Sequence, residues 1–310
     1  MRPLVPLVVL FCSALAAAQT CTSYVVVAAI DHTTGEEILN LKPADLRVAG
    51  GHTPLSIVSL EAGFKNRVMV LLEADGTDNN KIGEVADSIT KMAREAPEGK
   101  PLAFGIYADK TFFTSTFNAE PKARTAEIND VIEMGPKVGD RVAMYDALLE
   151  ALHKFGGHQP GDTILLVGDP FDNHSRHTSD DVRREFERTG TRLAIMLRSP
   201  LSRVARDFMW SQHLTEKRMF EELSARTGGM FVDYHPWLFR FPWKGYMVGI
   251  TEPSDAHSHK WKLKFATDAV QENRQTTLYY PQVLTPCTGS AAAQAKGPAQ
   301  PIPSNSIRSH

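Results

Sequence analysis

The stretch Arg-Val-Met-Val-Leu-Leu-Glu-Ala-Asp-Gly-Thr, residues 67–77, decides the fold of this chain. Its first half, residues 68–72, is an apolar run with the length of a buried β-strand, and its second half is a polar loop. Apolar residues then recur at the spacing of one helix face, at Ile82, Val85, Ala86, Ile89 and Met92. The stretch therefore predicts a strand, a loop and an amphipathic helix, the repeating unit of a parallel sheet.

The same pattern continues through the middle of the chain. We expect further buried strands over 163–167, 193–196 and 230–232, helices over 142–155, 179–188 and 216–226, and an antiparallel hairpin from 102–107 to 111–117. Alternating strands and helices predict an α/β fold with a doubly wound, mostly parallel sheet. Its ligand crevice should lie at the carboxyl ends of the strands.

Both flanks of this region are rich in strand-like sequence. The first flank predicts strand, turn and strand over 24–39 and a second short hairpin from 46–48 to 55–58, and the last flank predicts strands at 246–250, 261–265 and 277–280. We therefore expect N-terminal strands over 19–64, an α/β domain over 65–235, C-terminal strands over 236–287 and a disordered tail over 288–310.

The N-terminus has the features of a secretory signal. Arg2 precedes an apolar run from 4 to 15 and then three alanines, which predicts a signal peptide over 1–18. No later stretch is long and apolar enough to predict a transmembrane helix. We expect a secreted or periplasmic protein.

Signal cleavage would remove Cys12 and leave an even number of cysteines, Cys21 and Cys287, in an oxidising compartment. A disulfide between them would stabilise the fold by about 4 to 5 kcal/mol on the chain-entropy model; two unpaired thiols are the alternative. The bridge would join the two flanks into one small β-sandwich with the α/β domain inserted between its halves.

Charge and motifs exclude several function classes. The 34 basic and 36 acidic side chains nearly cancel, which argues against nucleic acid or an anionic membrane as a partner. The chain contains no nucleophile elbow, metalloprotease helix or phosphate-binding glycine loop. We therefore expect that the protein is not an enzyme.

Several ordered blocks resemble one family. These blocks are 73–77, 142–148, 165–175, the strands of 24–46 and the sequence Thr-Gly-Gly at 227–229. Together they resemble the von Willebrand factor A (VWFA)-related exported proteins best known from acidobacteria, whose domain carries a metal-ion-dependent adhesion site. The resemblance implies a binding module in which a magnesium ion, or manganese or calcium, accepts a carboxylate from a protein partner.

Carried over residue by residue, the resemblance places Glu73, Asp75, Thr77 and Asp169 as metal ligands and Val142 where the family has a threonine ligand. A valine cannot ligate, and three carboxylates would neutralise a divalent ion, so the site is degenerate. Metal binding at this site is therefore either weakened or lost. A second register that starts at Asp75 fits the following helix less well, and solvated or helix-capping carboxylates are the alternative interpretation.

Two other groups of residues suggest sites. Asp172 with His174 and His177, and Asp255 with His257 and His259, have the side chains of zinc ligands, but polar loop residues that face water explain them equally. The aromatic stretch 237–243 would form either a partner-binding patch or packing between the two domains.

From these observations we expect an exported protein-binding or adhesion-type module whose partner is a protein or a cell-envelope component. A structural scaffold subunit of an envelope assembly is the alternative. A secreted metal-dependent hydrolase is the third hypothesis, and a tightly bound transition metal would favour it.

Overall fold

The computed structural model describes residues 20–31, 34–38, 40–49, 55–74, 79–114, 116–139, 141–169, 171–197, 214–233, 236–253, 259–266 and 276–285. Predictions that fall elsewhere lie outside these residues: the signal peptide, Asp75, Thr77, Asp255, His257, Cys287 and the C-terminal tail. None of the described helices is long and apolar enough to cross a membrane.

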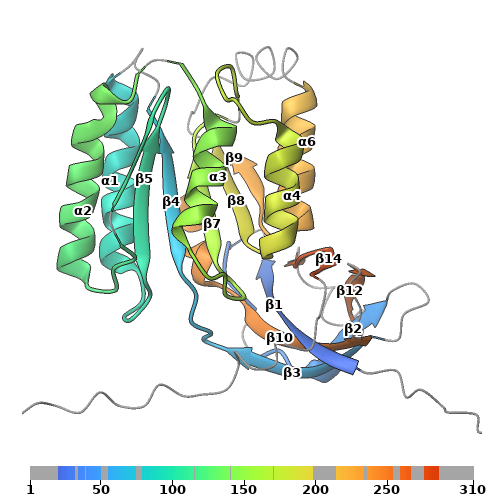
Figure 1. Cartoon of the computed structure of the whole chain (residues 1–310). Helices are drawn as coiled ribbons and strands as arrows, with labels where there is room; N and C mark the ends of the chain where they lie inside the picture. The colour runs from blue at the N-terminus through green and yellow to red at the C-terminus, as the bar shows by residue number, and fades with distance from the viewer. Residues whose placement is uncertain are drawn as a thin grey trace, which may run out of the picture.

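A six-stranded sheet forms the centre of the molecule, in the order β6-β5-β4-β7-β8-β9 (Figure 1). All neighbouring strands are parallel except the pair of β5 and β6. The strands are β4 (Val68–Glu73), β5 (Leu102–Tyr107), β6 (Thr111–Phe113), β7 (Thr163–Val167), β8 (Arg192–Leu197) and β9 (Phe231–Asp233). The prediction of a mostly parallel α/β sheet is confirmed.

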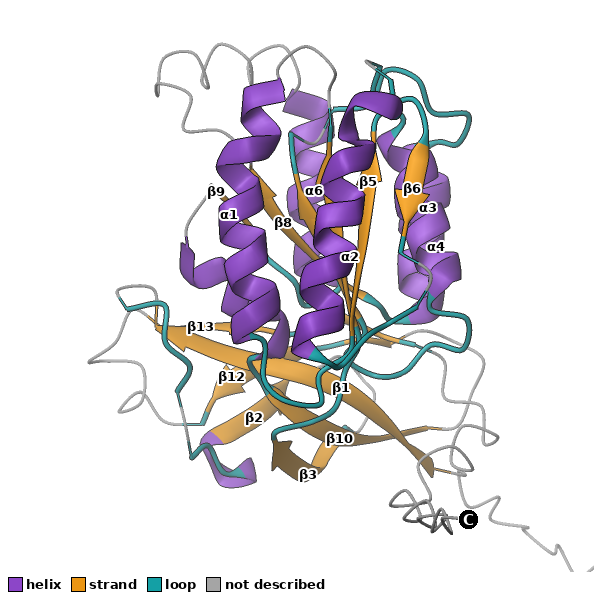
Figure 2. Ribbon diagram, turned by 90° about the vertical axis from the view of Figure 1, so that its left-hand side faces the viewer, coloured by secondary structure: helices purple, strands orange, loops and turns teal. Residues whose placement is uncertain are grey.

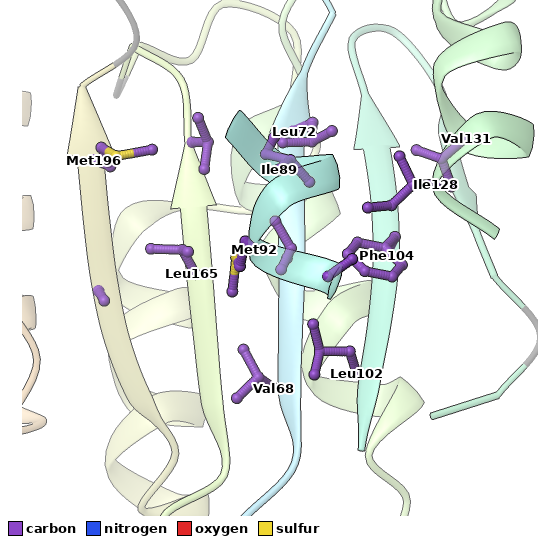
Figure 3. Close-up of a cluster of buried hydrophobic side chains, with 14 of the residues drawn as sticks. Val68, Leu72, Ile89, Met92, Leu102, Phe104, Ile128, Val131, Leu165 and Met196 are labelled. Atoms are coloured by element: carbon purple, nitrogen blue, oxygen red, sulfur yellow. The ribbon is translucent and has the colours of Figure 1, made fainter. Parts of the chain in front are cut away.

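Helices cover both faces of this sheet. Side chains of α1 (Asn79–Glu95) and α2 (Pro121–Met134) share one buried core with the sheet, which Figure 3 shows around Phe104, Ile89 and Ile128. The opposite core contains α3 (Met144–Lys154), α4 (Ser179–Thr189) and α6 (Leu214–Arg226). The sheet is therefore doubly wound. Because its strands are buried on both faces, their sequences are continuous apolar runs.

The helix α2 was not predicted, because its apolar face is narrow. Its buried residues are Arg124, Ile128 and Val131, and the first of these is charged. The Arg124 guanidinium donates hydrogen bonds to the backbone carbonyls of Ala93 and Ala119, so it takes the place of an apolar side chain in the packing against α1. A periodicity count misses a helix of this kind.

The two flanks of the chain pair with each other to form the small β-sandwich (Figure 2). One sheet has the order β13-β1-β10-β3 and consists of β1 (Thr20–Asp31), β3 (Ser56–Ala62), β10 (Tyr246–Pro253) and β13 (Thr276–Tyr279). Two short pairs complete it, β2 (Leu46–Ala49) with β12 (Lys262–Phe265) and β11 (His259–Lys260) with β14 (Val283–Leu284).

The first predicted turn is present in short form: after β1 the chain folds back, and Ile30 and Glu37 form an antiparallel bridge. The second predicted hairpin is wrong, because β2 and β3 pair with β12 and β10 and not with each other. Local spacing suggested hairpins, but these strands find their partners more than half the chain away, which a local pattern does not reveal.

The strand β1 contributes to two cores at once. Val27 and Ala29 belong to the core of the sandwich, whereas Ala28 and Ile30 pack into the core beneath α1 and α2. Successive side chains of a strand point to opposite faces, so one strand forms the floor of both parts. The sandwich and the α/β domain are thereby joined along β1.

Three 3-10 helices complete the described chain: η1 (Pro43–Asp45), η2 (Gly135–Lys137) and η3 (Pro236–Trp243). Within η3, Phe241 is fully buried and Trp243 is partly buried against the core beneath α1 and α2. The Phe241 ring lies 4.7 Å from the guanidinium of Arg192 and 5.5 Å from the Tyr279 ring. Of the two interpretations of this aromatic stretch, the position of Phe241 favours packing between the domains.

Cys21 lies in β1 and is disulfide-bonded. Its partner lies outside the described residues, so the pairing with Cys287 stays a prediction.

Candidate functional site

The chain switches sheet faces between β4 and β7. The helix after β4, α1, lies on one face, and the helix after β7, α4, lies on the other. In doubly wound sheets a crevice opens at such a point, at the carboxyl ends of the strands, and ligands bind there. The residues that lie there are the candidate site.

Glu73 lies at this switch point and binds the loop after β7. It is the last residue of β4, it is buried, and its Oε2 accepts a hydrogen bond of 2.6 Å from the backbone N–H of Asp169. A Cβ atom built on Gly168 would lie 2.5 Å from that Oε2, so only glycine permits the approach. The Glu73 carboxylate therefore joins the loop after β7 to the end of β4.

The loop after β7 then caps the helix α3. The N-cap residue of α3, Ala143, offers no side-chain acceptor. Instead, Asp172 Oδ2 accepts a 3.0 Å hydrogen bond from the Tyr145 N–H, and Ser175 Oγ accepts one of 3.0 Å from the Asp146 N–H. These are N–H groups of the first helical turn, which have no partner within the helix. A distant loop thus performs the capping that a local residue usually performs.

Val142 is fixed by the same loop. Its N–H donates to Asn173 Oδ1 at 2.9 Å, and its carbonyl oxygen accepts from the N–H groups of Asn173 and His174, both at 3.0 Å. Its side chain is buried in the core beneath α3. Where the resemblance predicted a ligand position, this chain has an apolar side chain and a backbone bonded to the neighbouring loop.

Asp146 accepts hydrogen bonds from the next part of the loop after β7. Its Oδ1 accepts from the backbone N–H of His177 at 3.1 Å and lies 2.7 Å from His177 Nδ1, and it also accepts from the Arg176 N–H at 3.2 Å. Burial would raise the pKa of this carboxyl, but the hydrogen bonds from His177 and Arg176 outweigh burial and lower the pKa. Asp146 is therefore anionic at neutral pH and holds the loop through charge-assisted bonds.

Asp109 connects a third loop, the turn between β5 and β6. It accepts two hydrogen bonds from Arg141, at 2.9 Å and 3.1 Å, and His174 Nε2 lies 3.5 Å from its Oδ1. Gly139, with φ 99°, packs against the Asp109 side chain in a conformation that favours glycine. The turn, the segment before α3 and the loop after β7 are thus tied together.

We call these residues the switch-point rim: Asp109, Arg141, Asp146, Asp172, His174, Arg176 and His177. Their arrangement has an inside and an outside. The side chains of Asp109 and Asp146 are 21% and 19% exposed, whereas those of Arg141 and Arg176 are 58% and 88% exposed. The rim therefore presents cationic groups to solvent above carboxylates that the chain itself has paired.

Tyr145 lies under the rim, in the first turn of α3. Burial, together with the negative charges of Asp172 and Glu216, raises the pKa of its hydroxyl to about 12. The phenol is therefore neutral throughout the physiological range.

The predicted metal ligands are only partly brought together. Glu73 and Asp169 meet, but through the backbone N–H of Asp169, and Asp75 and Thr77 lie outside the described residues. Val142 supplies no oxygen from its side chain. In the part of the chain that the structure describes, no three His, Cys, Asp or Glu side chains are grouped to hold a metal ion. The described donors do not fit a divalent cation, and we derive no step through one.

The structure separates the residues of the first predicted zinc site, and of the second it describes only one residue. His174 and His177 face different carboxylates, Asp109 and Asp146, while Asp172 caps α3. His259 lies in β11, and its predicted companions Asp255 and His257 are outside the described residues. The capping role of Asp172 and Ser175 was not predicted, although both are residue types that cap helices.

No family model and no curated protein matches the chain. Among solved structures, it is similar to the conserved hypothetical protein BatB from Bacteroides thetaiotaomicron (TM-score 0.36, 11% identity, 42% of this chain and 65% of that one). It is similar to the ArnB paralog VWA2 from Sulfolobus acidocaldarius (TM-score 0.38, 9% identity, 89% of this chain and 78% of that one).

A further similar structure is proximal thread matrix protein 1 from the mussel byssus with a zinc-occupied MIDAS motif (TM-score 0.38, 12% identity, 45% of this chain and 39% of that one). The chain spans less than two thirds of the BatB and thread matrix chains. Because all three TM-scores are below 0.5, these likenesses carry no argument about the site.

Proposed function

We propose that this chain is an exported, VWFA-type protein-binding module of the adhesion class, and that it contacts its partner through the switch-point rim without a divalent ion. The observation that carries the proposal is the use of the loop after β7 as the cap of α3. This loop is held by at least four backbone-directed hydrogen bonds, from the N–H groups of Tyr145, Asp146, Arg176 and His177. A loop ordered before contact loses less conformational entropy when a partner binds.

The charge distribution supports a polar, protein-type contact. Arg176 and His177 project from the ordered loop with side chains 88% and 50% exposed, and Arg141 lies on the adjoining segment. Arginine is enriched in protein–protein interfaces because its planar guanidinium forms several hydrogen bonds at once. In adhesion sites of the family a metal would attract the partner's carboxylate, and in this proposal the exposed arginines do so.

Photo-crosslinking in the host tests this surface. A photoreactive residue replaces Arg176 in one variant, and in the control it replaces Arg183 of α4, whose side chain is 41% exposed. We expect one defined protein adduct from position 176, none from position 183, and the same adduct after EDTA treatment. Absence of adducts from both positions would favour the scaffold alternative, and an adduct lost in EDTA would contradict the metal-free contact.

Calorimetry tests the metal separately. Magnesium and manganese are titrated into the chelator-stripped mature protein and into an Asp75→Ala variant. We expect no binding to either protein. Binding to the first that the variant abolishes would restore the adhesion-site ligands Glu73, Asp75, Thr77 and Asp169. A tightly held transition metal in the purified protein would instead favour the hydrolase hypothesis.

A further inference from the structure

A row of cationic side chains lies on the small β-sandwich, away from the rim. Lys260 in β11 and Lys262 and Lys264 in β12 are exposed, and they alternate with Trp261 and Leu263, which are buried in the core of the sandwich. Alternate residues of a strand share one face, so the three lysines point outward together. Arg47 of β2 lies directly opposite Lys264 and is exposed as well. We call these four residues the lysine row.

None of the four members of the lysine row forms an ion pair with another residue that the structure describes. Asp45, the last residue of η1 and the acid just before β2, accepts the backbone N–H of Lys42 with its carboxylate. Like charges directly opposite each other, such as Arg47 and Lys264, destabilise a sheet. The sandwich thus keeps a repulsive pair where an acidic residue on either strand would have been favourable.

A pocket adjoins one end of the row. It has a volume of about 330 Å³ and lies where α6 meets the C-terminal strands, a junction visible in Figure 1 beneath α6. Its walls include Glu222 and Arg226 of α6, Lys260, Trp261, Lys262 and Tyr280. The acid among these wall residues, Glu222, is paired with Arg226 at 3.3 Å, so within the described wall Lys260 and Lys262 are the charges without an ion-pair partner.

The pocket wall is built firmly. The backbone N–H of Gln282 donates to the Arg226 carbonyl at 2.8 Å, and the backbone N–H of Trp261 donates to the Gln282 carbonyl at 3.2 Å. The Trp261 ring packs edge-on against the Tyr280 ring, with the centroids 5.0 Å apart. Arg226 is also paired with Glu187 of α4 at 2.5 Å. These contacts fix the pocket relative to the lysine row.

We propose that the lysine row and this pocket bind an extended acidic segment of a protein partner. In an extended peptide, side chains on one face recur about every 7 Å, which is also the spacing of Lys260, Lys262 and Lys264 along their strands. Carboxylates at alternate positions would meet successive lysines, and a side chain at the end of the segment would enter the pocket. The site lies on the sandwich, so it is separate from the rim of the proposed function.

A binding titration tests this proposal. The probe is a fluorescent peptide of alternating glutamate and threonine, added to the mature protein, and the control probe carries glutamine in place of glutamate. We expect only the acidic peptide to bind, and more weakly as salt is raised, since exposed charges are screened. Equal binding of both peptides would overturn the proposal.

Variants locate the site. Lys262→Glu combined with Lys264→Glu should weaken peptide binding by about tenfold or more, while Lys262→Arg combined with Lys264→Arg should retain it. The matched control is Lys122→Glu, an exposed lysine on α2, which should leave affinity unchanged. Unchanged affinity in the double glutamate variant would overturn the proposal, and so would binding of polygalacturonate, an anionic polysaccharide, through the same lysines in place of the acidic peptide.

The crosslinking from position 176 serves as the folding control. It should persist in the double glutamate variant, since the rim and the lysine row lie on different parts of the molecule. Loss of peptide binding with crosslinking retained supports the site on the sandwich. Retained peptide binding in an Arg176→Glu variant would show that the two surfaces act independently.

Discussion

The switch-point rim and the lysine row treat charge in opposite ways. At the rim each of the carboxylates of Asp109, Asp146 and Asp172 accepts hydrogen bonds from the chain itself, so the charges hold loops in place. On the sandwich the cations of the lysine row have no ion-pair partner among the described residues. Internal pairing orders the rim and leaves the exposed parts of Arg141 and Arg176 to a partner, whereas the whole cationic groups of the lysine row remain available to another molecule.

The largest effect is expected from removing the disulfide, which lowers the stability of the sandwich and leaves the contacts of the rim unchanged. Replacing Cys21 and Cys287 with serine should lower the free energy of unfolding by about 4 kcal/mol on the chain-entropy model. Urea denaturation checks it. If the two cysteines form one bridge, each single variant should cost as much as the double variant. Costs that simply add would contradict the pairing.

A steric change at Gly168 should disturb the rim most. In Gly168→Ala the new Cβ would lie 2.5 Å from Glu73 Oε2 and 2.7 Å from Glu73 Cβ. Displacing the carboxylate from the Asp169 N–H should cost about 2 to 3 kcal/mol, again measured in urea. The matched control is Gly157→Ala, where no atom lies within 4 Å of the added Cβ. Equal stability of the two variants would refute the close approach.

Much of the fold could be predicted from the sequence, because buried parallel strands are continuous apolar runs and amphipathic helices repeat every three to four residues. The strands of the large sheet were found in this way. The pairing of β2 and β3 was not, since both join strands from the far end of the chain. Helix α2 escaped because a buried arginine interrupts its apolar face.

The resemblance pointed to the loops after β4 and β7 and to the segment before α3. Of these, the structure brings Glu73 at the end of β4 to the loop after β7, and joins that loop to the segment before α3. It assigned Val142 to a ligand position, whereas the structure buries that side chain and bonds its backbone to Asn173. Side-chain to backbone hydrogen bonds between loops leave no periodic trace in a sequence. The free lysines were visible as an alternation in 260–264, but their lack of partners was not.

A change at the cap should have a smaller effect than the one at Gly168. Asp172→Ala removes the acceptor of the Tyr145 N–H and should destabilise the protein by about 1 to 2 kcal/mol, while Asp172→Asn should retain most of the stability. Thermal unfolding followed by circular dichroism measures both. Asp180→Ala, which removes an exposed charge in the first turn of α4, is the control. A cost no greater than that of the control would mean that the loop does not cap α3.

Acid should loosen the rim through Asp146. Because hydrogen bonds outweigh burial and lower the pKa of this carboxyl in the folded protein, the unfolded chain takes up the proton first. The stabilisation is therefore present above the ordinary pKa of an aspartate and is lost as pH falls through the lower, folded value. Asp146→Asn should reduce the acid dependence of the urea midpoint. An unchanged pH profile would contradict the assignment.

The smallest effect is expected on the sandwich, with opposite signs for stability and binding. Lys264→Glu replaces repulsion with attraction opposite Arg47 and should raise the free energy of unfolding by about 0.5 kcal/mol. The same change should weaken binding of the acidic peptide. Adding Arg47→Glu restores like charges and should remove the gain. A variant that loses stability as well as binding would indicate that the lysines serve the sheet itself.

The two-sided packing of β1 also imposes an order in time. The strand is synthesised long before its register partners Tyr246 and Tyr279, which lie far along the chain. Until they follow, the edges of β1 and its sandwich face, with Val27 and Ala29, lack their cover, and such exposed strands are common starting points of misassembly. A nascent chain interrupted after β9 would thus expose the kind of surface that holding chaperones bind.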